Sequence, residues 1–140
     1  MRASAPRYLV DAGPLIALIN RRDQWHHWSE QVLRVIEEPL WTSEMVLAEV
    51  CHNLGQNTPA VRELLAHVQS GHLRLLPVAE ANVGRLVQLM VKFERMDVCD
   101  GSLVVLSERF PNAKIITVDV RDFSVYRRFD REPLPLIMPA

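Results

Sequence analysis

Two acidic residues stand at the ends of predicted β-strands, where their carboxylates could act together. Asp11 follows the apolar run of residues 8–10, and Asp119 follows the β-branched run of residues 115–118. In parallel sheets the carboxyl ends of the strands meet at one edge, where ligands bind. If these strands are neighbours, their carboxylates lie side by side in a partly dry cleft, which is unfavourable unless a cation lies between them. We therefore expect a divalent metal ion at this edge.

Three more acids could reach the same place from predicted helices. Glu49 lies beside the apolar stripe of a helix, and Asp97 and Asp100, spaced i, i+3, share one helical face. Carboxylate oxygens suit Mg²⁺ or Mn²⁺, which recruit substrate phosphates, so we expect chemistry on a phosphodiester. The alternative for Asp97 and Asp100 is that they only cap a helix. Glu49 could equally be a solvated surface residue, and Asp119 a plain turn former.

The positions of these acids depend on strands that alternate with helices along the chain. Apolar periodicity predicts strands at residues 8–10, 39–42, 72–78, 114–118 and 134–138. It predicts helices at residues 14–19, 25–36, 43–54, 58–70, 83–90 and 96–110, with Ser43 and Thr58 as N-caps. Trp25 and Trp28 are expected to anchor the second helix in the core. Sheets built in this order are mostly parallel, which predicts an α/β fold.

Length, charge and cysteine content limit the classes of protein. A chain of 140 residues predicts a single domain, residues 1–140. With 16 basic and 17 acidic residues, it lacks the positive field of a protein that coats nucleic acid, so any contact with polyanions would be local. Cys51 and Cys99 are too few for a disulfide framework, which predicts a cytoplasmic location. Residues 1–7 lack the apolar core of a signal peptide and no stretch is apolar enough to span a bilayer, so we expect no membrane association.

Four segments of the chain, taken in order, resemble the PIN-domain family and within it the VapC-type toxin ribonucleases. They are Leu-Val-Asp-Ala-Gly-Pro-Leu-Ile-Ala-Leu at residues 9–18, Thr-Ser-Glu-Met-Val-Leu-Ala-Glu-Val at 42–50, Met-Asp-Val-Cys-Asp-Gly-Ser-Leu-Val at 96–104, and Ile-Thr-Val-Asp-Val-Arg-Asp-Phe at 116–123. The resemblance implies a three-layer α/β/α fold with a central, mostly parallel sheet, and a Mg²⁺- or Mn²⁺-dependent endoribonuclease.

Carried over residue by residue, the resemblance also implies the site. The implied catalytic and metal-binding acids are Asp11, Glu49, Asp100 and Asp119, which would hold one or two ions, and the implied supporting residues are Asp97 and Thr117. The chain departs from the family pattern at Gly13, where many relatives carry Ser or Asn. It departs again at Gly101, where Ala is usual, a change expected to weaken the helix start by up to ~1 kcal/mol.

The resemblance implies partners as well: an RNA substrate, a small antitoxin whose segment enters the acidic cleft with an Arg, and a second copy of the chain in a homodimer. Basic residues could contact RNA at the rim of the cleft, although each could equally be solvated surface charge. They are Arg21, Arg22, Arg121, Arg127 and Arg128. His26 and His27 are expected to be exposed polar residues, and the two cysteines to pack in the interior.

Three rival classes remain open at this point. A PIN scaffold could bind RNA or protein without cutting it. A receiver-type signalling domain would need an acidic pair near the first strand, which Asp11-Ala12-Gly13 does not supply. A haloacid-dehalogenase-type phosphatase would need a second Asp at position 13, where Gly stands. The chain also lacks the Walker phosphate loop and the dinucleotide-binding glycine pattern.

Overall fold

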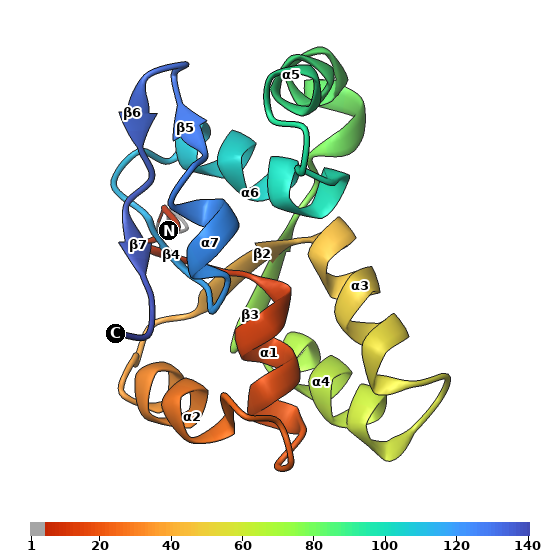
Figure 1. Cartoon of the computed structure of the whole chain (residues 1–140). Helices are drawn as coiled ribbons and strands as arrows, with labels where there is room; N and C mark the ends of the chain where they lie inside the picture. The colour runs from red at the N-terminus through yellow and green to blue at the C-terminus, as the bar shows by residue number, and fades with distance from the viewer. Residues whose placement is uncertain (1–4) are drawn as a thin grey trace.

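The computed structural model describes residues 5–140, so part of the 1–7 segment, in which no signal peptide is expected, lies outside the described residues. At its centre is a sheet of five strands in the order β3-β2-β1-β4-β7 (Figure 1). Every neighbouring pair in this sheet is parallel, which confirms the prediction of a parallel α/β sheet. The strands are β1 (Tyr8–Val10), β2 (Leu40–Ser43), β3 (Leu73–Leu76), β4 (Lys114–Ile116) and β7 (Leu136–Ile137).

Helices cover both faces of the sheet. One face is covered by α6, which packs on β1, β2 and β4 and carries α5 outside it; α1 contacts α2 and α4 on the other side (Figure 1). The fold is therefore the expected three-layer α/β/α arrangement. Among residues 5–140, no helix combines the length and apolar character needed to cross a bilayer. The helices are α1 (Ala12–Ile19), α2 (His26–Arg34), α3 (Glu44–Leu54), α4 (Pro59–Gln69), α5 (Ala79–Lys92), α6 (Val98–Arg109) and α7 (Val120–Phe123).

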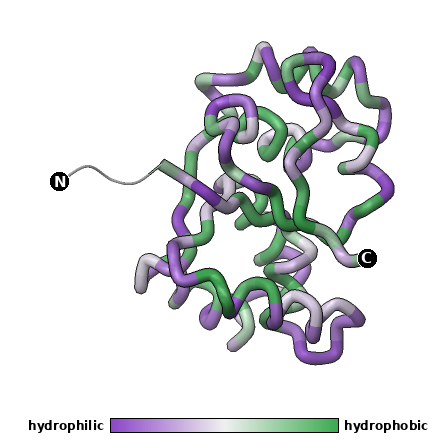
Figure 2. Tube along the Cα trace, turned by 90° about the vertical axis from the view of Figure 1, so that its left-hand side faces the viewer, coloured by the Kyte–Doolittle hydropathy of each residue, from purple (hydrophilic) through white to green (hydrophobic). Residues whose placement is uncertain are grey.

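The core is formed by the central strands and by α6. Leu9 and Val10 of β1 and Ile115 and Ile116 of β4 are fully buried. Seven consecutive residues of α6, from 101 to 107, are buried as well, so this helix has no solvent-facing side over two turns. In Figure 2 the hydrophobic segments run through the middle of the molecule, while hydrophilic segments lie mostly at its periphery. This packed centre gives the strand ends a rigid support.

Two helix starts confirm the predicted capping residues. The Ser43 hydroxyl accepts a hydrogen bond from the backbone N–H of Val46 at 3.1 Å, and Thr58 accepts one from Val61 at 3.2 Å. Ser43 also pairs with the buried Ser102 hydroxyl at 2.7 Å. This hydrogen bond connects the N-cap of α3, at the end of β2, to α6.

Some predicted bounds are wrong. The strands predicted at 72–78, 114–118 and 134–138 are shorter in the structure, because their outer residues form bends or irregular segments outside the sheet. The two tryptophans are not core anchors: both are half-buried, and Trp28 packs against the edge of the core while Trp25 is not part of it. Only Ser29 and Leu33 of α2 are fully buried, because α2 is an amphipathic helix on the surface. Cys51 and Cys99 are half-buried and pack against the core.

The region after β4 contains elements that we did not predict. The short α7 is followed by an antiparallel hairpin of β5 (Arg127–Arg128) and β6 (Glu132–Pro133). Its turn places Phe129 and Asp130 at φ 51° and 63°, a conformation uncommon for residues other than glycine. Contacts from outside the hairpin hold this turn: Glu108 accepts the Phe129 N–H at 2.7 Å, and Arg85 donates to Asp130 at 3.1 Å. The hairpin is thereby fastened to α5 and α6.

Candidate functional site

Asp11 and Asp119 lie at the same edge of the sheet because their strands are neighbours. Val10 of β1 is paired with Ile116 of β4, so the chain leaves both strands at one level. Asp11 caps α1 by accepting the Ala12 N–H at 2.8 Å, and Asp119 caps α7. The predicted juxtaposition of the two strand ends is present in the structure.

Thr117 connects these two acids. Its hydroxyl donates to Oδ2 of Asp11 at 2.8 Å and accepts the backbone N–H of Asp119 at 3.0 Å. The pKa of Asp11 is raised to about 6, mainly by burial and also by the negative charges of Glu49 and Asp119, against the opposing effect of the hydrogen bonds from Thr117 and Ala12. The site thus holds a buried carboxyl that forms no ion pair with a Lys, Arg or His within the described residues 5–140.

Asp100 approaches from the first turn of α6. Its backbone N–H donates at 2.8 Å to Asp97, the N-cap of the helix, and its Oδ2 accepts the Tyr126 hydroxyl at 2.6 Å. Burial raises the pKa of Asp100 to about 7, and the charges of Asp11, Asp97 and Asp119 act in the same direction. The N-cap alternative is therefore realised for the exposed Asp97, while the Asp100 carboxylate faces the other acids.

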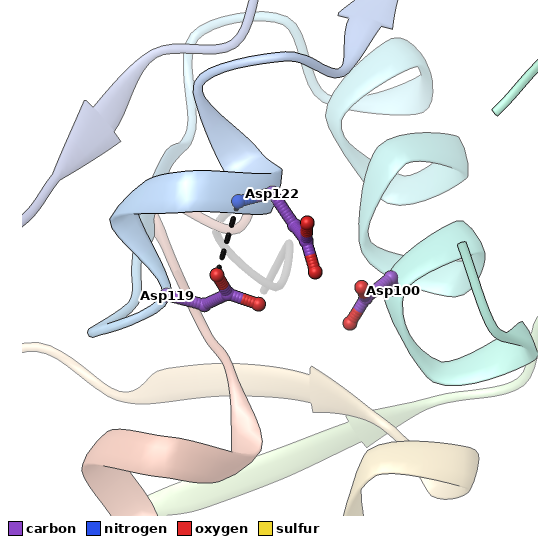
Figure 3. A group of neighbouring side chains, drawn as sticks. All are labelled: Asp100, Asp119 and Asp122. Carbon is purple, nitrogen blue, oxygen red and sulfur yellow. Dashed lines mark hydrogen bonds between the residues drawn. The ribbon is translucent and has the colours of Figure 1, made fainter. Parts of the chain in front are cut away.

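A further aspartate, Asp122, which we did not predict as a site residue, completes a tight cluster. Asp100, Asp119 and Asp122 each offer a carboxylate oxygen, and these oxygens all lie within 4.8 Å of one another (Figure 3). The Asp122 backbone N–H donates to Asp119 Oδ1 at 3.0 Å, so one turn of α7 holds both acids. The Asp-x-x-Asp spacing at a helix start is the sequence signal that could have indicated it.

Glu49 lies near the cluster without joining it. It is half-buried on α3, and its negative charge acts on both Asp11 and Cys99. Burial, together with Glu49 and the neighbouring aspartates, raises the pKa of the Cys99 thiol to about 12. Its Sγ lies 3.5 Å from the Met45 carbonyl oxygen, so this cysteine is a protonated packing residue and not a thiolate.

The donor set fits a hard divalent cation. The acids of the cluster offer carboxylate oxygens, the ligands that suit Mg²⁺ and Mn²⁺. Asp11 and Asp100 have raised pKa values because burial and like charges oppose their ionisation. A cation placed among them would remove this penalty.

The family comparison agrees with this geometry. The PIN domain model matches residues 8–129 of the chain, which includes all the acids described above. The chain belongs to the PIN domain family. None of the curated proteins compared with it matches.

Solved structures of toxin–antitoxin proteins share this PIN fold. One is Mycobacterium tuberculosis VapC20, described as a sarcin–ricin loop cleaving toxin, with 19% identity, a TM-score of 0.69, and coverage of 77% of this chain and 86% of that one. A toxin–antitoxin complex from Klebsiella pneumoniae has 15% identity and a TM-score of 0.69, over 95% of this chain and 98% of that one. VapBC2 from Rickettsia felis, bound to a DNA fragment from its promoter, has 16% identity and a TM-score of 0.62 over the same shares.

The two glycines that depart from the PIN pattern lie at close contacts. A Cβ at Gly13 would come within 2.5 Å of Val118 Cγ2, so α1 can pass the end of β4 only without a side chain here. A Cβ at Gly101 would lie 3.1 Å from Leu86 Cδ2, where α5 packs on α6. Both glycines therefore allow close packing around the PIN site.

The basic residues expected at the rim divide into two groups. Arg127 and Arg128 are not solvated surface charges: Arg127 donates to three backbone carbonyls, and Arg128 pairs with Glu132 at 3.1 Å. Arg21, Arg22 and Arg121 are exposed. His27 is exposed as expected. His26 is half-buried, with its Nδ1 2.7 Å from the Ala17 carbonyl oxygen, so the expectation for it is wrong.

Proposed function

We propose that this chain is a divalent-metal-dependent endoribonuclease that hydrolyses RNA phosphodiester bonds, the toxin of a toxin–antitoxin pair. The observation that carries the proposal is the gathering of buried and half-buried carboxylates at the strand ends, two of them with raised pKa values. Carboxylates alone repel phosphate, so this cluster suits a phosphodiester substrate only if it binds cations that reverse the local charge. The PIN family match and the VapC neighbours support the same reading.

The proposed ion is Mg²⁺ or Mn²⁺, held by Asp11, Glu49, Asp100 and Asp119. The tight cluster adds Asp122 to this set as a further candidate ligand. When bound, the ion would lower the pKa of a water molecule and neutralise charge on the leaving oxygen.

The protein's own groups prepare the acids for this task. Thr117 donates to Oδ2 of Asp11 and the Ala12 N–H donates to its Oδ1, while Tyr126 donates to Oδ2 of Asp100. Among residues 5–140 no hydrogen bond is made to Oδ1 of Asp100. Asp97 supports Asp100 by holding the first turn of α6. With pKa values of about 6 and 7, Asp11 and Asp100 carry protons for part of the time near neutral pH. They must release these protons before they can act as anionic ligands.

The proposal includes the partners that the PIN resemblance implies. A small antitoxin would place a segment in the acidic cleft, with an Arg facing the cluster, in keeping with the toxin–antitoxin complexes that share the fold. We further propose that residues 1–140 form one domain, that two copies form a homodimer, and that the protein works in the cytoplasm. Two unpaired cysteines suit a reducing compartment.

The test is RNA cleavage by the purified protein with Mg²⁺, with Mn²⁺ and with EDTA. Asp11→Asn and Asp100→Asn should each lower the rate by about a hundredfold or more, since even a group that only orients a metal ligand contributes about 10- to 100-fold. Asp23→Asn is the matched control, because Asp23 caps the turn before α2 and Asn can accept the same bond from Trp25.

Two results would contradict the proposal. Cleavage that survives both substitutions and EDTA would overturn the mechanism. Binding of RNA without cleavage under any metal condition would instead favour a catalytically silent PIN module.

A further inference from the structure

One basic side chain reaches into the acidic cluster. Arg95 Nε donates to Oδ1 of Asp122 at 2.9 Å. Within residues 5–140 no other Lys, Arg or His forms an ion pair with Asp100, Asp119 or Asp122. The pKa of Arg95 is raised first by the hydrogen bond to Asp122, and the charge of Asp119 adds to the effect. The cluster thus already has one counter-cation from its own chain.

The two partners differ in their freedom to move. The Asp122 side chain is 16% exposed and belongs to the turn that also holds Asp119, whereas the Arg95 side chain is 59% exposed. The backbone at Arg95 is fixed, since Met96 is buried and donates its N–H to the Phe93 carbonyl at 3.0 Å. Arg95 can therefore leave Asp122 by side-chain rotation alone and still remain at the edge of the site.

We propose that Arg95 binds an RNA phosphate group. In the metal-free protein its guanidinium is paired with Asp122, and a divalent ion bound at Asp122 would displace the guanidinium, which could then contact the RNA. The inference rests on the proposed nuclease function, because it names the group that would receive the RNA backbone. It adds a positioning role for Asp122, a residue that we did not predict as part of the site.

The exchange follows from the charges involved. Asp122 Oδ1 already accepts a hydrogen bond from Arg95 Nε. The Arg95 guanidinium would therefore compete with a metal ion for the same carboxylate. An exposed ion pair contributes little stability, so breaking it is easy, while a divalent ion beside the guanidinium would repel it. A released guanidinium offers a planar fork that matches a phosphate group. Metal binding and RNA binding would then be linked through one residue.

The first test is the affinity for Mn²⁺, measured by electron paramagnetic resonance without RNA. Arg95→Ala should tighten Mn²⁺ binding by about three- to fivefold, because the competing cation is gone. The same substitution in an Asp122→Asn background should have no further effect. Arg131→Ala is the control for net charge, since Arg131 is exposed and forms no ion pair among residues 5–140. Equal affinities for the parent protein and Arg95→Ala, or no Mn²⁺ binding by either, would overturn the exchange.

The second test is binding of a fluorescent single-stranded RNA to the parent protein, followed by stopped-flow fluorescence before cleavage, with Mn²⁺ and with EDTA. Adding Arg95→Ala should weaken binding about tenfold in Mn²⁺ and lower the slope of log Kd against log salt by about 0.7, but have little effect in EDTA. Arg95→Lys should retain part of the affinity. An Arg95→Ala effect no larger than that of Arg131→Ala would overturn the phosphate-binding role. Failure of the parent protein to cut RNA in Mn²⁺ would instead count against the nuclease function and leave the Mn²⁺ result standing.

Discussion

Two hydroxyl groups of buried residues orient two aspartates of the site through hydrogen bonds. Thr117 holds Asp11, and Tyr126 holds Asp100 through a 2.6 Å hydrogen bond. Burial and the bond to Asp100 raise the pKa of the Tyr126 hydroxyl, so it stays a donor throughout the physiological range. Its ring is fixed by edge contacts with Phe93 and Phe123, at centroid distances of 5.5 and 5.2 Å. The site therefore depends on a rigid aromatic residue that binds no metal.

Tyr126→Phe should keep this packing and release one oxygen of Asp100. Because the Tyr126 bond lowers the pKa of Asp100, its loss raises that pKa further and makes metal binding at neutral pH harder. We expect Mn²⁺ affinity to fall about tenfold and the free energy of unfolding to fall by about 1 kcal/mol, measured by Mn²⁺ titration and urea unfolding. Tyr8→Phe is the control, since the Tyr8 hydroxyl forms no hydrogen bond among residues 5–140. Unchanged Mn²⁺ affinity in Tyr126→Phe would contradict the positioning role.

At the scale of elements, strand ends and helix starts build the site together. Asp11 ends β1 and caps α1, Asp119 follows β4 and caps α7, and Asp97 caps α6. Carboxylates are favoured at helix N-termini, where the backbone N–H groups are unpaired. The junctions must also pass close to one another, and at Gly13 the approach to Val118 leaves no room for a Cβ.

Gly13→Ser would install the side chain that is common in the family, and we expect it to destabilise this chain. The new Cβ would lie 2.5 Å from Val118 Cγ2, and Val is too stiff to move aside. Overpacking of this kind costs about 1–3 kcal/mol, measured by urea unfolding. Adding Val118→Ala should recover most of the loss, although Val118→Ala alone is mildly destabilising. A Gly13→Ser variant as stable as the parent would contradict this account of the junction.

The structure also shows which elements the sequence could predict. Asp11 and Asp119 were predictable because each follows a short apolar strand, and the parallel order of the sheet brings their ends together. Asp122 could have been indicated by its Asp-x-x-Asp spacing from Asp119 at a helix start. Tyr126 joins the site only through the packing of the segment after α7, which no local pattern encodes. The β5–β6 hairpin was missed for a similar reason. Its turn uses Phe129 and Asp130 at positive φ instead of glycine, because Glu108 and Arg85 hold it from outside.

Across the whole molecule, acidic charge is concentrated at one edge of the sheet although the net charge is only −1. Burial raises the pKa of Asp11 to about 6 and that of Asp100 to about 7, from an ordinary value of 3.8. Between the ordinary pKa of 3.8 and the raised values of about 6 and 7, these two carboxyl groups bind more protons in the folded chain than in the unfolded chain. Stability is therefore lost as the pH rises through this range, the reverse of the usual behaviour of paired carboxylates.

In EDTA, the melting temperature should accordingly fall by several degrees between about pH 5 and pH 8, and saturating Mn²⁺ should restore it at pH 8. Differential scanning calorimetry across this range gives the measurement. Asp11→Asn and Asp100→Asn should each flatten the decline in EDTA, because the substituted residue no longer ionises. A decline of equal slope in both variants and the parent would show that other groups cause it.

The place of β1 in the sheet has a consequence for synthesis. β1 is the first strand in the chain yet lies between β2 and β4, and its partners in β4 begin at Lys114, about a hundred residues later. Asp11 is synthesised long before Asp100, Asp119 and Asp122. The acids can therefore share an ion only after the later three residues have been added. The acidic cluster of a nascent chain is thus incomplete until the segment that carries Asp122 has been translated.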